Sequence, residues 1–212
     1  MTFQQNLAVG KAGESKIARW LQSRGNYVLP VYEKEIHEYK GPVLFAPDGQ
    51  QIICPDLLAI TKTGIAWIEA KHKSAFTYSR CFSEKRLRDV WNTGIDLKHY
   101  QEYIRVQNEL KHIPVWLMFL HQAGTAKDTP KGKISPTGLF MASLRHLRQN
   151  ECHRHENHGK SGMVYWEPHV FQRHIPLDHF MERSAIMEYD GGMTEEASIE
   201  AAKVAYAELQ PA

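Results

Sequence analysis

Residues 55–71 constrain the fold more than any other stretch, because they contain two short apolar runs joined by a tight turn. The runs predict an antiparallel hairpin whose strands are apolar on both faces. A two-residue loop at Lys62-Thr63 places Asp56 opposite Glu69, since opposed residues in a hairpin have numbers of constant sum. Lys71 lies two residues beyond Glu69 and therefore shares its face.

The two carboxylates and the lysine are expected to meet where the apolar runs reach the edge of a sheet. Burying such charges without partners costs on the order of several kcal/mol, so they need each other, water or a cation. The cluster therefore indicates a cation site, with a salt-bridged hairpin end as the alternative. A turn with a bulge at Gly64 would shift the register by one residue, and a later irregularity would have to restore the site.

Upstream, residues 10–21 have apolar side chains at helical spacing, and Glu14 lies one turn before that apolar stripe, pointing the same way. The neighbouring Gly10 and Gly13 favour close packing of this helix against a sheet. As an alternative, Glu14 is a charge near a helix start that the helix dipole favours.

Together, these three motifs resemble those of the PD-(D/E)XK nuclease superfamily. The order Gly-Lys-x-x-Gly-Glu, Pro-Asp and Ile-Glu-Ala-Lys is most similar to archaeal Holliday-junction resolvases and related phage or mobile-element nucleases. The resemblance covers about residues 10–121. It implies an α/β class with a restriction-endonuclease-like core of order α-β-β-β-α-β, a mixed sheet flanked by helices.

Hydrolysis of a phosphodiester suits a divalent cation, which lowers the pKa of bound water and stabilises developing charge. Mg²⁺, with Mn²⁺ as a substitute, prefers oxygen ligands, here Asp56, Glu69 and the carbonyl of Ala70, with Glu14 acting directly or through water. Lys71 is expected to orient or deprotonate the attacking water or to stabilise the developing charge.

The remaining core elements are expected at residues 27–32 (strand), 97–108 (helix) and 115–120 (buried strand). In many superfamily members this helix carries a Gln or Lys near the metal. The resemblance therefore points to Gln101 as a catalytic residue and to Lys98 near the substrate, with ordinary surface residues as the alternative.

An insertion at residues 74–94 combines basic and aromatic side chains, a mixture suited to phosphate contact and base stacking. The basic residues expected to contact nucleic acid are Arg80, Lys85, Arg86 and Arg88, and the aromatic ones are Phe76, Tyr78, Phe82 and Trp91. A solvated helix over residues 83–91 is the alternative.

Residues 122–212 form a C-terminal α+β extension expected to pack on, or complete, the core of residues 1–121. A strand at 137–144 is expected to pair with one at 163–166, and residues 194–209 read as a helix. The His-rich stretch 152–158 predicts a polar loop. Zinc is the alternative there, although a structural zinc site normally repeats a paired ligand spacing and this stretch contains one cysteine.

Composition limits the class of protein. The chain has 212 residues and is 42% hydrophobic, with no apolar run long enough for a membrane span and no signal peptide. Three cysteines in an unpaired count indicate a reducing, cytoplasmic setting. A net charge of +2 means that any DNA-binding surface must be a local patch. No phosphate-loop motif occurs, so a motor ATPase would be a separate protein.

The sequence therefore predicts a metal-dependent deoxyribonuclease, an endonuclease rather than an exonuclease, whose partners are DNA and, as an option, a second copy in a homodimer. A non-catalytic nucleic-acid-binding module on the same fold is the alternative. A carboxylate-dyad hydrolase without metal fits less well, because the adjacent lysine suits a cation site better than a shared proton.

Overall fold

The computed structural model describes residues 3–31, 43–83, 86–125, 129–157 and 161–189. A six-stranded mixed sheet runs through it in the order β1-β4-β5-β8-β9-β12, and β5 and β8 form its parallel pair. The strands are β1 (Tyr27–Pro30), β4 (Leu57–Thr61), β5 (Gly64–Lys73), β8 (Val115–His121), β9 (Gly138–Ser143) and β12 (Arg173–Ile175). The α/β class expected from the sequence is confirmed.

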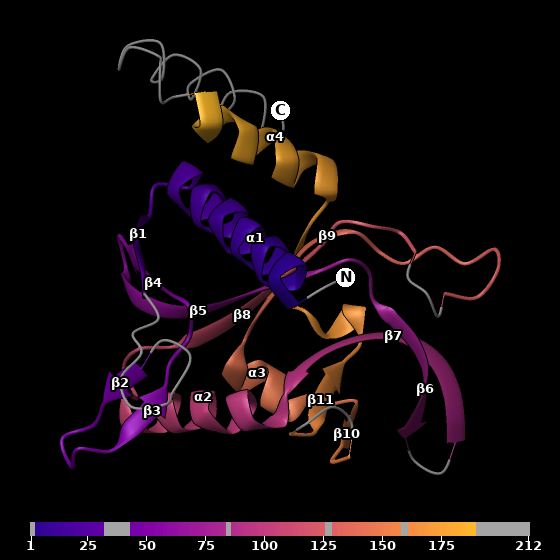
Figure 1. Cartoon of the computed structure of the whole chain (residues 1–212), viewed down its shortest axis with the longest axis horizontal. Helices are drawn as coiled ribbons and strands as arrows, with labels where there is room; N and C mark the ends of the chain where they lie inside the picture. The colour runs from indigo at the N-terminus through magenta and orange to yellow at the C-terminus, as the bar shows by residue number, and fades with distance from the viewer. Residues whose placement is uncertain (1–2, 32–42, 84–85, 126–128, 158–160, 190–212) are drawn as a thin grey trace.

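Helices cover both faces of this sheet (Figure 1). On one face lie α1 (Phe3–Ser23) and α4 (Leu177–Tyr189), which pack on each other, and on the other lies α2 (Leu97–Glu109). Along the chain, α1, β1, β4, β5, α2 and β8 follow one another in the expected order, with one hairpin interposed before β4 and another after β5.

The β4–β5 hairpin has the register that a two-residue loop requires. Thr61 pairs with Gly64 and Leu57 with Ile68, without the alternative bulge. The Thr63 backbone N–H donates to the Thr61 hydroxyl at 3.1 Å, and that hydroxyl donates to the Gly64 carbonyl at 3.0 Å. Gly64 has φ +151°, a conformation that residues with a Cβ rarely adopt.

Both faces of this hairpin are packed, as expected. Trp67 belongs to the apolar cluster that contains α2, whereas Ile68 belongs to the cluster that contains α1 and α4. The buried side of α2 consists of Tyr100, Tyr103 and Val106, while Gln101, which the resemblance pointed to as catalytic, is exposed.

A second sheet has four strands in the order β10-β11-β7-β6. They are β6 (Thr77–Ser83), β7 (Arg86–Asp96), β10 (His153–His155) and β11 (Met163–Trp166). Three expectations are wrong here. The strand at 163–166 pairs with β7 and β10 instead of β9, and residues 86–91 are strand, so no helix spans 83–91. Within the polar loop expected at 152–158, His153–His155 form β10.

The remaining elements are short. A two-stranded hairpin of β2 (Val43–Phe45) and β3 (Gln51–Ile53) precedes β4, and α3 (Leu144–Gln149) follows β9. A single 3₁₀ turn, η1 (Pro168–Val170), precedes β12. The expected helix at 194–209 lies outside the described residues, and the boundary at residue 121 stays a prediction, although β9 and β12 share the sheet of β8.

Candidate active site

Asp56 lies in the short link between β3 and β4 and is held from two sides. Its backbone carbonyl accepts a hydrogen bond from the Val31 N–H at 2.9 Å. Its carboxylate oxygen Oδ2 accepts one from the Ala70 N–H on β5 at 3.0 Å. The hairpin register and this cross-strand bond together bring Asp56 beside Glu69, as the sequence predicted.

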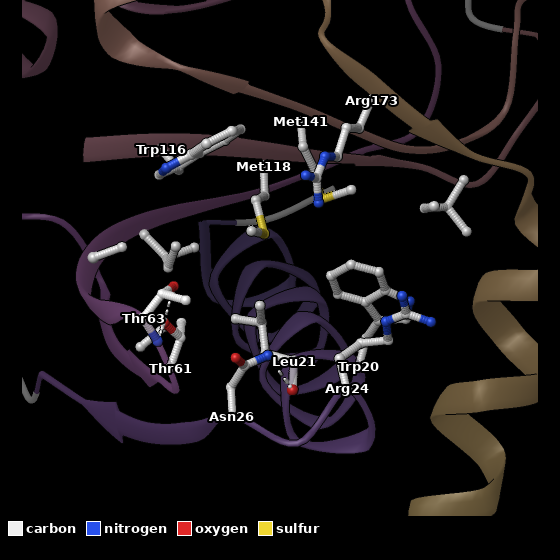
Figure 2. Close-up of a pocket in the computed structure, with 14 residues that line it drawn as sticks. Trp20, Leu21, Arg24, Asn26, Thr61, Thr63, Trp116, Met118, Met141 and Arg173 are labelled. Carbon is white, nitrogen blue, oxygen red and sulfur yellow. Dashed lines mark hydrogen bonds between the residues drawn. The ribbon is translucent and has the colours of Figure 1, made fainter. Parts of the chain in front are cut away.

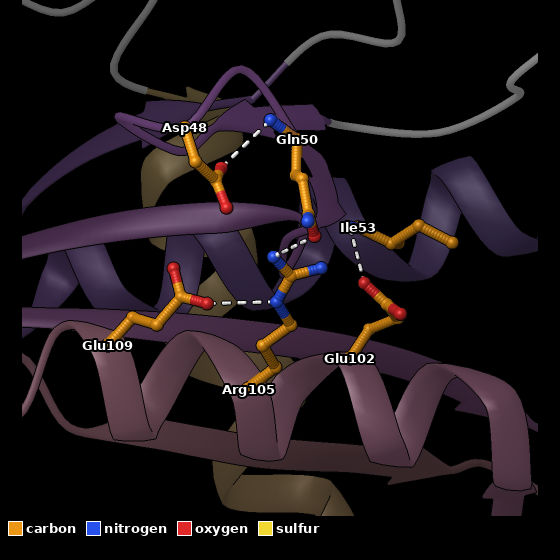
Figure 3. A network of polar contacts seen from close by, with 6 residues as sticks. All are labelled: Asp48, Gln50, Ile53, Glu102, Arg105 and Glu109. Atoms are coloured by element: carbon orange, nitrogen blue, oxygen red, sulfur yellow. Dashed lines mark hydrogen bonds and ion pairs between the residues drawn. The ribbon is translucent and has the colours of Figure 1, made fainter.

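The β2–β3 hairpin, which precedes Asp56 in the chain, is anchored on α2 by polar contacts (Figure 3). The Ile53 N–H at the end of β3 donates to the Glu102 carboxylate at 3.2 Å. Arg105 donates to the Gln50 side chain and to Glu109, each at 2.8 Å. Helix α2 thus holds the β2–β3 hairpin three residues before Asp56.

Glu69 is a fully buried carboxylate on β5. Lys71, whose side chain is 29% exposed, forms an ion pair with Glu69 Oε1. Burying an ionised carboxylate without compensation is costly, and the Lys71 ammonium supplies the opposite charge.

The charges in this cluster act strongly on one another. Burial, followed by the negative charge of Glu69, raises the pKa of Asp56 to about 7. Burial alone would lower the pKa of Lys71, but the carboxylates of Glu69 and Asp56 outweigh it and raise that pKa above its usual value. Near neutral pH, Lys71 is therefore charged and Asp56 is partly protonated.

Glu14 on α1 is half-buried, and its charge contributes to the raised pKa of Lys71. The helix approaches β5 closely at the preceding residue: a Cβ added to Gly13 would lie 2.2 Å from the Cβ of His72. A Cβ at Gly10 would meet nothing within 4 Å. The close packing expected of two glycines thus holds for Gly13 and not for Gly10.

Helix α2 directs different residues to the cluster from those expected. Gln101 and Lys98 are solvent-exposed. Tyr103 is buried, and its pKa is raised well above the usual value by burial and then by the charges of Glu69 and Asp56. The pKa of His99 is lowered by burial and then by the Lys71 charge.

The rings of His99 and Tyr103 are 6.1 Å apart, one helical turn from each other. The available sequence signal was the three-residue spacing of Tyr100, Tyr103 and Val106, which marks the buried side of α2 better than a stripe containing polar Gln101 does. No pattern singled out His99.

The donor set fits Mg²⁺ better than zinc. Within the described ranges, no group of three or more His, Cys, Asp or Glu side chains is placed to hold a metal ion. Two carboxylates and a backbone carbonyl, completed by water, are ligands that Mg²⁺ accepts and a structural zinc site does not. In the His-rich region, Cys152 is disulfide-bonded, so its sulfur is no zinc thiolate.

The basic insertion forms the β6–β7 hairpin. Arg80 lies on β6, and Arg86 and Arg88 lie on β7; their side chains, with all of Lys85, are outside the described part of the chain. Phe76 is fully buried, which removes it from the residues expected to stack on bases.

The other aromatic side chains of the insertion differ in their surroundings. The rings of Tyr78 and Trp91 contact each other edge to face, with centroids 4.8 Å apart. The side chain of Phe82 is outside the described part of the chain.

Comparisons with known proteins give a likeness in structure and none in sequence. No family model matches the chain, and no curated protein matches its sequence. A Holliday-junction resolvase from Archaeoglobus fulgidus, Hjc, is similar in structure with a TM-score of 0.42 and 10% sequence identity, over 76% of this chain and 91% of that one. Separately, no helix among the described residues is long and apolar enough to cross a membrane.

Proposed function

We propose that this chain is a divalent-metal-dependent nuclease of the PD-(D/E)XK type that hydrolyses phosphodiester bonds in DNA. The proposal rests on the close grouping of Asp56, Glu69 and Lys71 at one end of the β4–β5 hairpin. Glu69 is fully buried there and forms an ion pair with Lys71. A structural salt bridge needs one carboxylate for one lysine, whereas here a second carboxylate is held beside the first.

Asp56, Glu69 and the carbonyl of Ala70 would hold Mg²⁺ or Mn²⁺. Burial, followed by repulsion from Glu69, raises the pKa of Asp56 to about 7 in the metal-free protein. A divalent cation would relieve that repulsion, which supports this assignment. Glu14, whose charge reaches Lys71, would act on the cation directly or through water. The bound cation supplies an acidic water and charge stabilisation.

Lys71 acts as a positive charge beside the reacting phosphate. In the metal-free protein its raised pKa keeps the ammonium protonated, which favours electrostatic stabilisation over proton abstraction. Its ion pair with Glu69 fixes the ammonium on the face where both carboxylates lie. Tyr103 and His99 close the α2 side of the cluster, and neither carries charge near neutral pH.

The test is a cleavage assay with Mg²⁺ or Mn²⁺ on branched, flapped, blunt and single-stranded DNA. We expect metal-dependent cleavage of at least one substrate by the wild type, and loss of cleavage in Glu69→Gln. Glu109→Gln is the matched control, because Glu109 is a carboxylate on the outer side of α2, paired with Arg105. Absence of cleavage with intact DNA binding would support the binding-module alternative.

The basic residues of the β6–β7 hairpin are proposed to contact DNA phosphates. Replacing Arg80, Arg86 or Arg88 by Ala should weaken binding at low salt and reduce the slope of log affinity against log salt by about one per lost contact. Arg145→Ala, an exposed arginine on α3, is the control. An unchanged slope in all three variants would assign DNA contact to another surface.

A further inference from the structure

A pocket of about 350 Å³ lies on the α1 side of the six-stranded sheet, the face opposite to Glu69 and Lys71. Its walls come from the end of α1, the β4–β5 hairpin and strands β8, β9 and β12. Its volume is within the range of roughly 300–1,000 Å³ that small-molecule sites occupy. The pocket shares no lining residue with the carboxylate cluster.

The pocket exists because two small residues oppose each other where the covering helix ends. Ala59 pairs directly with Ala66 across β4 and β5. Helix α1 ends at Ser23, and the Asn26 amide then donates to the Leu21 carbonyl at 2.8 Å, which turns the chain away. The sheet therefore continues beyond the helix that covers it.

Larger apolar side chains surround these alanines. On β8, Trp116 pairs with Ile68, and Met118 pairs with Met141 on β9. Figure 2 shows Trp116 and the Thr61–Thr63 turn on one side of the pocket and Met118 near its centre. Tryptophan offers a flat apolar surface, and methionine adapts to the shape of what it contacts.

The charge at the pocket has one sign. Arg24, directly after the end of α1, and Arg173 from β12 line it; in Figure 2 Arg24 lies beside Trp20 and Arg173 beside Met141. None of its lining residues is Asp or Glu. Within the described part of the chain, neither arginine forms an ion pair, so their positive charge is available to an anion.

We propose that this pocket binds a small organic anion with a flat apolar body. The carboxylate or phosphate group of the ligand is held by Arg24 and Arg173, whose planar guanidinium groups match such anions through paired hydrogen bonds. The body of the ligand lies against Trp116 and Met118. This site is independent of the proposed nuclease activity, since it lies on the other face of the sheet.

The test is titration calorimetry on the purified full chain without added metal. Four probes separate the contributions: adenosine monophosphate and indole-3-acetate carry both an anion and a flat body, adenosine lacks the anion, and inorganic phosphate lacks the body. We expect at least one of the first two to bind about tenfold or more tightly than the last two. Binding of only the nucleotide, or only the aryl carboxylate, identifies the ligand class.

Three variants test the location. Arg24→Gln and Arg173→Gln should each weaken binding about tenfold or more, while Arg145→Gln, an exposed arginine outside the pocket, should not. Ala66→Leu should block the pocket with both arginines in place. Failure of both anions to bind more tightly than phosphate, or binding that survives both arginine substitutions, would overturn the proposal.

Discussion

The two faces of the β4–β5 hairpin differ in what they bury, apolar side chains on one and charged groups on the other, although neighbouring residues of one strand supply both. Ile68 is packed against α1 in an apolar cluster, whereas Glu69 is a buried carboxylate beside a second acid. On the first face burial favours folding, and on the second it opposes folding. We infer that one face supplies stability and the other supplies chemistry at some expense of stability.

The largest expected effect is on the apolar face. Ile68→Ala should lower the free energy of unfolding by about 2–5 kcal/mol, because it leaves a cavity among buried side chains. Chemical denaturation measures it. Ile65→Ala, at a position 41% exposed on the same strand, should change stability by no more than about 0.5–1 kcal/mol. Equal losses in both variants would contradict the packing described.

On the charged face, the expected loss is in rate. Lys71→Ala should slow DNA cleavage by roughly a hundredfold or more, about 2.7 kcal/mol, because the positive charge stabilises the transition state. DNA affinity should change little, and Lys71→Arg should not restore the rate, since a planar guanidinium does not replace a compact ammonium. Lys111→Ala, at an exposed lysine that no prediction places near the substrate, is the control. Wild-type cleavage by Lys71→Ala at saturating Mg²⁺ would remove the catalytic assignment.

A third expectation concerns how closely α1 approaches β5. Gly13→Ala should cost about 1–3 kcal/mol of unfolding free energy, since the new Cβ would overlap His72. Gly10→Ala on the same helix meets nothing within 4 Å and should stabilise by up to about 1 kcal/mol through helix propensity. Thermal melts of the two variants should therefore shift in opposite directions, and shifts of the same sign would contradict this packing.

The smallest expected effect is the pH dependence of the charged face. The pKa of Asp56 is about 7 in the folded protein against 3.8 unfolded, so its contribution to stability is present below pH 3.8 and is lost as pH rises through about 7. Asp56→Asn lacks this loss. Without metal, it should be more stable than the wild type by about 0.5–2 kcal/mol at pH 8, and the difference should vanish near pH 4.

Added Mg²⁺ provides the matching control for that expectation. It should stabilise the wild type clearly more than Asp56→Asn, because the variant lacks one of the two carboxylates proposed to hold the cation. A melting temperature of the wild type that does not respond to Mg²⁺ or Mn²⁺ would remove the metal-site proposal while leaving the pH effect in place.

Local features of the fold were predictable from the sequence. The opposition of Asp56 and Glu69 follows from a two-residue turn and the period of a strand, both of which act within a few residues. Strand β8 is a continuous apolar run after Pro114, and the predicted bounds of 115–120 differ from the observed bounds by one residue. Helix α2 was also located, although its buried side was not.

Non-local features were not predictable, because their causes lie far away in the sequence. The run at 163–166 has the pattern of a strand, yet the pattern does not encode that it pairs with β7. Gln101 was favoured for its chemistry, but the rotation of α2 is set by packing of Tyr103 and Val106 against the sheet. The short strands β2, β3 and β12 each have three residues, too few for periodicity to reveal.

The contact between α1 and α4 bears on the order in which the protein acquires its structure. The rings of Trp20 and Phe180 lie 6.5 Å apart, although they come from opposite ends of the described chain. Synthesis proceeds from the N-terminus, so the outer side of α1 can be covered only after Phe180 has been made. In the same way, β9 can pair with β12 only after β12 has been made. Contacts this distant in sequence slow folding, so apolar surface of the first helix stays open to chaperones until nearly the last described residues have been made.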